Sequence, residues 1–309
     1  MTGAPRRSAQ TVIEVRDLAK YYGELAAVDG VSFEVEQGEF FGILGPNGAG
    51  KTTTLEMVEG LRRPDRGQVT LLGGSPWPRN ADLQARIGVQ LQASAFFERL
   101  TAREQIRTFA SLYDVPAASA DGWLEQVGLA DKAKTRTENL SGGQLQRLAI
   151  ACALVHEPEI VFLDEPTASL DPQARRNLWE LLDGLSESGR TVVLTTHHMD
   201  EAEALCDRVA IMDRGLILKL DSPAALVRGL DAPVRIYVSP HLMPLEQARE
   251  IPGAESVEED GVSVVLTTRQ PSNVLTALAQ REALEGLQVR AATLEDVFLD
   301  LTGREYRPE

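Results

Sequence analysis

The stretch that decides the fold is Gly45-Pro46-Asn47-Gly48-Ala49-Gly50-Lys51-Thr52, which matches the pattern G-x-x-x-x-G-K-S/T. It follows a strand predicted by the apolar run Phe40–Leu44, and it opens a helix predicted over Thr52–Glu59, which is the context that the pattern requires. Its glycines let backbone N–H groups curl around phosphate oxygens, and the helix N-terminus adds a positive dipole end. We therefore expect a phosphate-binding loop, with Lys51 reaching the β- and γ-phosphates of a nucleotide and Thr52 ligating Mg²⁺.

A second signal is the apolar run Ile160–Leu163, which ends in Asp164-Glu165. A buried strand of an α/β sheet delivers side chains at its carboxyl end, where ligands bind in this fold class. Asp164 is thus placed to hold Mg²⁺, directly or through water, and Glu165 to polarise an attacking water as a general base. Alone, such a strand end is a weak signal, but behind a phosphate-binding loop at this distance it is a strong one.

A third signal is Leu140-Ser141-Gly142-Gly143-Gln144, which precedes a helical pattern running through Leu154. Ser141 is expected to cap this helix, and the two glycines leave backbone amides exposed. The result is a second helix N-terminus suited to an anion. A plain capped helix start is the alternative interpretation of this motif taken by itself.

Together and in this order, the three motifs resemble the ABC ATPase family over residues 11–228. In that family two nucleotide-binding domains pair head to tail, and each ATP lies between the phosphate loop of one domain and the LSGGQ segment of the other. The resemblance implies that ATP and Mg²⁺ are the ligands. The implied nucleotide contacts are Asn47, Gly48, Ala49, Gly50, Lys51, Thr52 and Thr53 from one copy, and Ser141, Gly143 and Gln144 from the other.

Further positions match the family one by one. Tyr22 falls where the family stacks an aromatic ring on adenine, although the adjacent Tyr21 competes for this place. A half-buried tyrosine at a strand end is the alternative. Gln92 matches the loop glutamine that touches Mg²⁺ and couples hydrolysis to the membrane subunit, and Gln90 fits the family spacing less well.

Asp171 matches the loop that contacts the opposite subunit, and His197 matches the histidine that faces the γ-phosphate. His198 beside it is taken as a bystander. A lone histidine is most often structural, but His197 ends a buried strand downstream of the two carboxylates. Because Glu165 is present, the resemblance implies a site that hydrolyses ATP rather than one that only binds it.

Short apolar runs alternate with helical patterns as far as residue 222, which predicts an α/β fold with strands buried on both faces. With the resemblance, the expected fold is a P-loop ABC cassette over residues 11–228. It consists of a RecA-like core, an antiparallel β subdomain and a helical subdomain at about 93–157. The predicted strands are Thr11–Val15, Val31–Val35, Phe40–Leu44, Val69–Leu72, Ile87–Leu91, Ile160–Leu163, Thr191–Thr195 and Val209–Met212.

A different pattern fills residues 233–309, which we expect to form a small α+β accessory domain. Its predicted elements are Val234–Val238, a helix at 245–250, strands at 255–259 and 262–267, a helix at 273–281 and a strand at 287–291. This order, β-α-β-β-α-β, indicates a ferredoxin-like arrangement. A last amphipathic helix is predicted over 294–301, with one apolar face made by Leu294, Val297, Phe298 and Leu301.

Composition excludes several classes of protein. The 309-residue chain has a formal net charge of -15, which argues against generic binding to the phosphate backbone of nucleic acids. Its two cysteines, Cys152 and Cys206, lack metal-ligand spacing and indicate a reduced cytosolic protein. Residues 1–10 are expected to be a disordered tail rather than a signal peptide, and no run approaches the ~18 apolar residues that span a bilayer.

Several stretches are similar to the ATPases of ABC-2-type exporters, the group that contains daunorubicin-resistance-type drug efflux pumps. They are 56–61, 87–92, 197–203 and 294–303. This similarity implies two copies of the subunit, in the cytoplasm and peripheral to the inner face of the cell membrane, with a separately encoded permease. An importer ATPase and a soluble ABC protein acting on ribosomes or DNA remain as alternatives. The cargo stays open, because such a subunit never contacts it.

The resemblance also implies a docking groove for a cytoplasmic helix of the permease, beside Gln92 and the segment Phe96–Tyr113. Phe96, Phe97 and Leu100 are apolar residues near that loop. The alternative is that they simply pack the helical subdomain.

Overall fold

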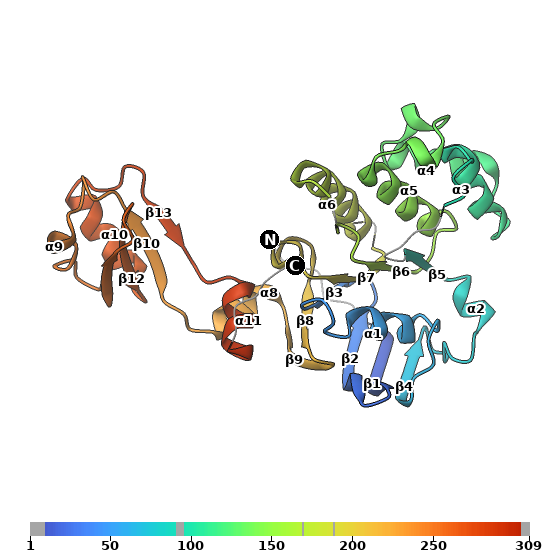
Figure 1. Ribbon diagram of the computed structural model, residues 1–309, viewed down its shortest axis with the longest axis horizontal. Helices are drawn as coiled ribbons and strands as arrows, with labels where there is room; N and C mark the ends of the chain where they lie inside the picture. Colours follow the sequence, from blue (N-terminus) through green and yellow to red (C-terminus); the bar gives the residue numbers. More distant parts are fainter. Residues whose placement is uncertain (1–9, 91–95, 169, 188, 304–309) are drawn as a thin grey trace, which may run out of the picture. The chain divides into compact units, whose positions relative to one another are not determined.

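We describe residues 10–90, 96–168, 170–187 and 189–303 of the chain in a computed structural model (Figure 1). The described residues up to Pro223 form one compact unit, and a second unit begins at Ala224. The predicted tail lies outside the described residues except for Gln10. Gln92 also lies outside the described residues.

The first unit is organised around a six-stranded sheet of order β5-β6-β7-β3-β8-β9. The first five strands in this order are parallel, and β9 pairs antiparallel with β8. The central strands are apolar and buried throughout, as expected for a sheet covered on both faces. The strand bounds are β3 Phe40–Leu44, β5 Ile87–Gln90, β6 Ile160–Asp164, β7 Thr191–Thr196, β8 Arg208–Asp213 and β9 Leu216–Asp221.

A second, antiparallel sheet has the order β2-β1-β4, with β1 Thr11–Tyr22, β2 Leu25–Glu36 and β4 Arg66–Leu71. It is the antiparallel β subdomain that the fold assignment expected. The strands β1 and β2 are longer than their apolar runs predicted, because the backbone pairing continues past several register shifts toward the turn at Gly23.

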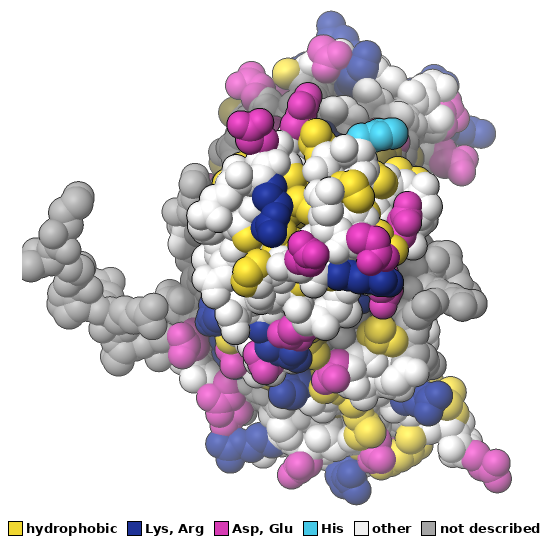
Figure 2. All heavy atoms as spheres, turned by 90° about the vertical axis from the view of Figure 1, so that its left-hand side faces the viewer, with side chains coloured by type: hydrophobic (Ala, Val, Ile, Leu, Met, Phe, Trp, Pro, Cys, Tyr) yellow, Lys and Arg dark blue, Asp and Glu magenta, His cyan; other side chains and the backbone are white. Residues whose placement is uncertain are grey.

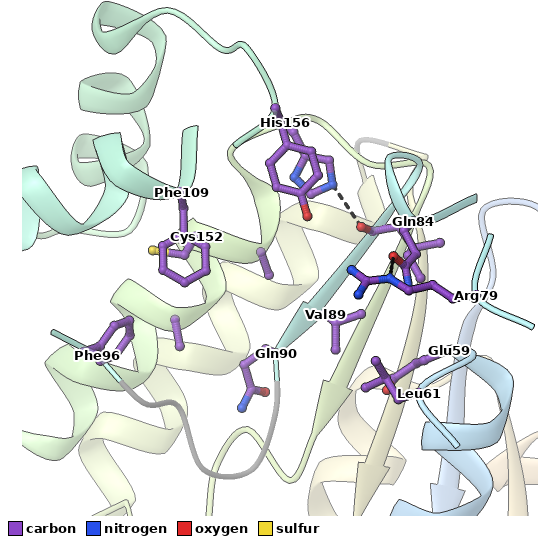
Figure 3. A pocket seen from close by; sticks show the side chains of 14 residues that line it. Glu59, Leu61, Arg79, Gln84, Val89, Gln90, Phe96, Phe109, Cys152 and His156 are labelled. Atoms are coloured by element: carbon purple, nitrogen blue, oxygen red, sulfur yellow. Dashed lines mark hydrogen bonds between the residues drawn. The ribbon is translucent and has the colours of Figure 1, made fainter. Parts of the chain in front are cut away.

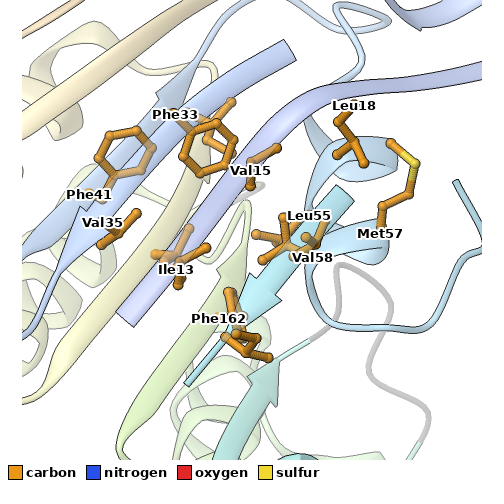
Figure 4. Packing of buried hydrophobic residues seen from close by; sticks show 14 of the residues in the cluster. Ile13, Val15, Leu18, Phe33, Val35, Phe41, Leu55, Met57, Val58 and Phe162 are labelled. Atoms are coloured by element: carbon orange, nitrogen blue, oxygen red, sulfur yellow. The ribbon is translucent and has the colours of Figure 1, made fainter. Parts of the chain in front are cut away.

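Helix α1, Lys51–Val58, packs against both sheets, and its apolar side chains join their common core (Figure 4). Leu55, Met57 and Val58 are at most 1% exposed. In the same core the rings of Phe33 and Phe41 stack with centroids 5.1 Å apart. Burial of this helix fixes the phosphate-binding loop that precedes it.

The helical subdomain contains α3 Ala102–Ser111, α4 Ala117–Gln126 and α5 Gly142–Leu154, which contact one another. Thr101 and Ser141 begin α3 and α5 with the two capping boxes that their spacing indicates. The remaining helical segments of this unit are α2 Ala81–Gln84, the 3-10 turns Ala130–Lys132 and Thr137–Asn139, α6 Pro172–Glu187 and α7 Met199–Leu205.

The second unit contains a four-stranded antiparallel sheet of order β11-β12-β10-β13. If the strands of this unit are counted from β10 as the first, their order across the sheet is 2-3-1-4. Helices follow the first and third strands, and this is the predicted ferredoxin-like arrangement. The elements are α8 Pro223–Gly229, β10 Val234–Val238, α9 Leu245–Ala248, β11 Ser256–Glu259, β12 Val264–Thr268, α10 Pro271–Gln280, β13 Gln288–Arg290 and α11 Leu294–Thr302.

Figure 2 shows the second unit from its α9 end, with acidic and basic side chains mixed across the surface. No field of one sign covers this face, so its charge alone favours no class of partner. Among the residues that the structure describes, every helix is too short or too polar to cross a lipid bilayer.

Helix α11 has the predicted amphipathic character, and Asp296 accepts a hydrogen bond from the Thr293 N–H at 2.8 Å at its start. Leu294, Val297 and Phe298 are buried. None of the three belongs to the apolar cluster beneath the four-stranded sheet. The helix is therefore not a simple extension of that small core.

The burial of Phe298, which is 2% exposed, gives a test of this packing. We expect Phe298→Ala to lower the free energy of unfolding of the whole chain by about 3–5 kcal/mol, measured by urea denaturation. The neighbouring Leu299 is 41% exposed, so Leu299→Ala should change it by less than about 0.5 kcal/mol. Equally small effects of both substitutions would show that the α11 face is not packed in solution.

Candidate functional site

The parallel register of three strands brings the chemistry-bearing residues to one edge of the sheet. Strand β7 lies between β3 and β6, with Leu44 opposite Thr196 and Asp164 opposite Thr195. The phosphate-binding loop follows β3, Glu165 follows β6 and His197 follows β7. Because the carboxyl ends of these strands coincide, segments about 150 residues apart in sequence meet at one site.

Lys51 lies at the centre of this site and is 4% exposed. Its ammonium donates hydrogen bonds to the carbonyl oxygens of Gly45 at 2.9 Å and Pro46 at 3.2 Å. It also forms an ion pair with Glu165, with 3.0 Å between Nζ and Oε1. The loop carbonyls and the carboxylate together satisfy the three donors of a buried ammonium.

The loop that holds Lys51 requires glycine at two points. Gly50 has φ of 101°, and a Cβ there would lie 2.3 Å from the Ala27 carbonyl oxygen. A Cβ at Gly45 would lie 2.1 Å from the carbonyl oxygen of Met212. The backbone therefore approaches its neighbours too closely for any side chain.

The other predicted loop residues differ in exposure. Asn47 and Gly48 are exposed, Thr53 is half-buried, and the Ala49 side chain is buried in the core. A contact of Ala49 with a nucleotide would therefore use its backbone.

Asp164 and Thr52 lie together at the site. The Thr52 hydroxyl donates to Asp164 Oδ1 at 3.2 Å, and the Thr195 hydroxyl donates to the same oxygen. Burial raises the pKa of Asp164 above its usual value, against the opposing effect of these two hydroxyl donors. Hydroxyl and carboxylate oxygens are the hard ligands that Mg²⁺ prefers, so the pair fits this ion chemically.

Glu165 joins the two sides of the site. Its Oε2 lies 3.2 Å from His197 Nδ1, while its Oε1 faces Lys51. Burial by itself raises the pKa of this carboxyl, but the His197 hydrogen bond and the Lys51 charge outweigh it and lower the pKa to about 2. Glu165 also has a left-handed backbone, with φ of 47°, and strained residues of this kind are concentrated at functional sites.

The hydroxyl of Thr195 is the member of this cluster that the sequence interpretation missed. It donates to Asp164, and it accepts from the backbone N–H of Glu165 at 3.0 Å. A polar residue directly after the apolar run Val192–Leu194 was the available signal. His198, the predicted bystander, lies beside His197 with the two rings tilted at 43° and their centroids 4.1 Å apart, and burial lowers the pKa of His198 to about 4.

Tyr22 ends β1 with a ring that is 44% exposed. Lys20 Nζ lies 5.7 Å from its centroid, and the Arg62 guanidinium lies 5.6 Å away. The competing Tyr21 instead donates its hydroxyl to Asp29 at 2.8 Å. Of the two rings, Tyr22 is the more exposed one.

Ser141, Gly143 and Gln144 lie at the start of α5 in the helical subdomain. The Ser141 Oγ accepts from the Gln144 N–H, and the Gln144 side chain accepts from the Ser141 N–H at 3.0 Å. Ser141 is exposed. The hydrogen bonds that Ser141 and Gln144 make in the described structure thus lie within the helix start itself.

Asp171 begins α6, where its Oδ1 accepts from the backbone N–H groups of Gln173 and Ala174, both at 3.0 Å. It is exposed. Gln90, the residue that competed with Gln92, ends β5 and is 2% exposed.

Parts of the chain match known protein families. A family model described as "ABC transporter" matches residues 28–168, and one described as "Nodulation factor export protein NodI, C-terminal domain" matches residues 244–303. The chain is 39% identical to the Nod factor export ATP-binding protein I of Ralstonia nicotianae, over 98% of this chain and 97% of that protein. It is 41% identical to the protein of the same name from Paraburkholderia xenovorans, over 96% and 99% of the two chains.

Among solved structures, the dimeric structure of a bacterial ABC transporter cassette has a TM-score of 0.63 and 29% identity, covering 68% of this chain and 98% of that one. This similarity confirms the P-loop ABC cassette fold that the sequence predicted. Identities of the size found for the two export proteins, over nearly the whole of both chains, show that this protein belongs to the family of ABC transporter ATP-binding proteins, whose members bind and hydrolyse ATP.

Proposed function

We propose that the chain is the ATP-hydrolysing subunit of an ABC-2-type exporter and works as two head-to-tail copies that sandwich ATP. The observation that carries the proposal is the cluster in which one glutamate, Glu165, contacts both Lys51 and His197 beside Asp164. Export is favoured over import by the names of the two relatives, which both describe export of Nod factor. The cargo of this chain stays open, because its class is set by the permease.

In this proposal Lys51 changes partner during the cycle. The β- and γ-phosphates of ATP compete with Glu165 for the Lys51 ammonium, which lies 3.0 Å from the carboxylate. Once Lys51 faces the phosphates, Glu165 loses a cation that lowers its pKa, so its basicity rises. Glu165 then orients and polarises the attacking water, while His197 holds the carboxylate and faces the γ-phosphate.

Thr52 and Asp164 are the residues that would hold Mg²⁺, together with Gln92, which lies outside the described residues. When bound, the ion would neutralise negative charge on the β- and γ-phosphates. Asn47, Gly48, Ala49, Gly50 and Thr53 would contact phosphates through the loop, and Tyr22 would stack on adenine.

The second copy is proposed to complete the site. Ser141, Gly143 and Gln144, at a helix start where Ser141 is exposed, would bind the γ-phosphate of the ATP that the other copy holds. Asp171 would contact the opposite subunit. The dimeric form of the similar cassette supports this pairing.

The permease is proposed to dock beside the helical subdomain, which would hold the subunit at the inner face of the membrane. Phe97 is 62% exposed, so it does not pack the subdomain core as the alternative interpretation required. Phe96 is half-buried and lines a pocket there, and Leu100 is half-buried as well. A large exposed aromatic side chain is a typical anchor for a protein partner.

Glu165→Gln tests the catalytic assignment, since it removes the base and keeps the size of the side chain. We expect ATP hydrolysis to fall by about 100- to 10,000-fold while ATP binding persists, measured by steady-state turnover and by a nucleotide-binding titration. Lys51→Ala should instead weaken nucleotide binding itself. Turnover near the wild-type rate in Glu165→Gln would refute the role of Glu165.

A mixture of two inactive variants tests the head-to-tail dimer. Lys51→Ala and Ser141→Arg should each be inactive alone, but one composite site in each mixed dimer keeps both intact partners. Random pairing in a symmetric dimer then predicts recovery of about a quarter of the wild-type rate. If both folded proteins dimerise and their mixture stays inactive, the composite site is wrong.

A further inference from the structure

A pocket of about 400 Å³ lies in the first unit between the end of α1, strand β5 and the helical subdomain (Figure 3). Most of its lining is apolar, including Leu61, Val89, Phe96 and Phe109. One acidic side chain, Glu59, faces it from the end of α1. The pocket is thus an apolar hollow with a single carboxyl group in its wall.

Glu59 is buried without compensation. It is 2% exposed, and neither carboxyl oxygen has a hydrogen-bond partner among the residues that the structure describes. Burial raises the pKa of this carboxyl to about 8, and the charges of Asp164 and Glu56 add to the effect. A buried carboxyl without partners destabilises the fold, so a leucine of similar size would serve the isolated subunit better.

The surroundings of Glu59 show which chemistry would satisfy it. The residue caps the C-terminus of α1, where the helix dipole is negative and a cation is stabilised. The nearby Arg62 is already paired with Glu56, and Arg79, which lines the same pocket, donates to the amide oxygen of Gln84. Neither arginine hydrogen-bonds Glu59 among the described residues, so a cation that enters from outside meets a carboxyl group at a helix C-terminus.

A second polar group in the pocket wall, the imidazole of His156, also has an acceptor atom without a hydrogen-bond donor in the described part of the chain. His156 Nε2 lies 2.9 Å from the Ile87 carbonyl oxygen, which only accepts, so Nε2 carries the proton and Nδ1 is an acceptor. The Nδ1 atom is buried without a partner among the described residues. Both unsatisfied groups thus suit an occupant that brings hydrogen-bond donors.

We propose that Glu59 is a recognition residue that pairs with an Arg or Lys side chain on the cytoplasmic segment of the permease that enters this pocket. The inference rests on the proposed function, which requires a permease, and it adds the chemical identity of the contact. Charge complementarity and the apolar lining identify this occupant as an apolar segment with one cationic side chain. Glu59 and Lys51 stand at opposite ends of α1, so the same short helix carries the partner contact and the phosphate loop.

The first experiment uses the isolated chain and its melting temperature. Glu59→Leu should raise the melting temperature by about 2–6 °C, because it removes an unsatisfied buried group. The matched control is Glu201→Leu, since Glu201 is equally buried but its Oε1 accepts from Trp179 Nε1 at 3.1 Å, whereas neither oxygen of Glu59 has such a donor among the described residues. Glu201→Leu should lower the melting temperature. A loss of stability in Glu59→Leu as large as that in Glu201→Leu would overturn the proposal, because Glu59 would then have an internal role.

The second experiment uses the complex with the membrane protein that copurifies with the chain in detergent and stimulates its ATP hydrolysis. We expect Glu59→Gln, which preserves shape, to weaken this association about 10- to 100-fold. The charge-reversed Glu59→Lys should be rescued by permease variants in which an Arg or Lys becomes Glu or Asp. Rescue only by substitutions that change the size of an apolar side chain would overturn the proposal.

Phe97→Asp separates failure of this inference from failure of the proposed function. If Phe97→Asp weakens the association while Glu59→Gln leaves it unchanged, docking at this surface stands and the role of Glu59 is wrong. If neither variant affects the association, the permease does not dock here, and the docking part of the proposed function falls together with the inference.

Discussion

The structure depends on one buried ion pair, that between Lys51 and Glu165. A buried ammonium and a buried carboxylate are each costly alone, so the strands that lead into these residues, β3 and β6, must hold a fixed register. Strand β7 sets this register by lying between β3 and β6, and it adds Thr195 to orient Asp164 and His197 to hold Glu165. The same geometry that satisfies these charges assembles the groups that ATP hydrolysis needs.

Much of the fold and site could be predicted from the sequence, because the decisive motifs are contiguous. The loop from Gly45 to Thr52 carries its own strand and helix, and β3 has the predicted bounds. The ferredoxin-like order of the second unit also followed from local patterns. The family resemblance extended these local inferences to Tyr22, Asp171 and His197, whose roles remain proposals.

What the sequence did not predict depends on contacts between distant segments. Strand β9, Leu216–Asp221, was missed because its apolar run is short, from Leu216 to Leu218, and a lysine follows it. Thr195 acquires its role only through the pairing of β6 with β7. Glu59 is one of 46 acidic residues in the sequence, and only the packing of α1 against its neighbours shows that it is buried and unsatisfied.

In the proposed function a complete hydrolytic site needs two copies of the chain, with the Ser141 helix start of one copy facing the Lys51 cluster of the other. The most direct test is the rate of ATP hydrolysis by the purified chain as a function of its concentration, at saturating ATP and Mg²⁺. We expect a rate that rises with the square of subunit concentration until the dimer is saturated. A rate strictly proportional to concentration over the whole range, from a chain shown to be monomeric, would contradict it.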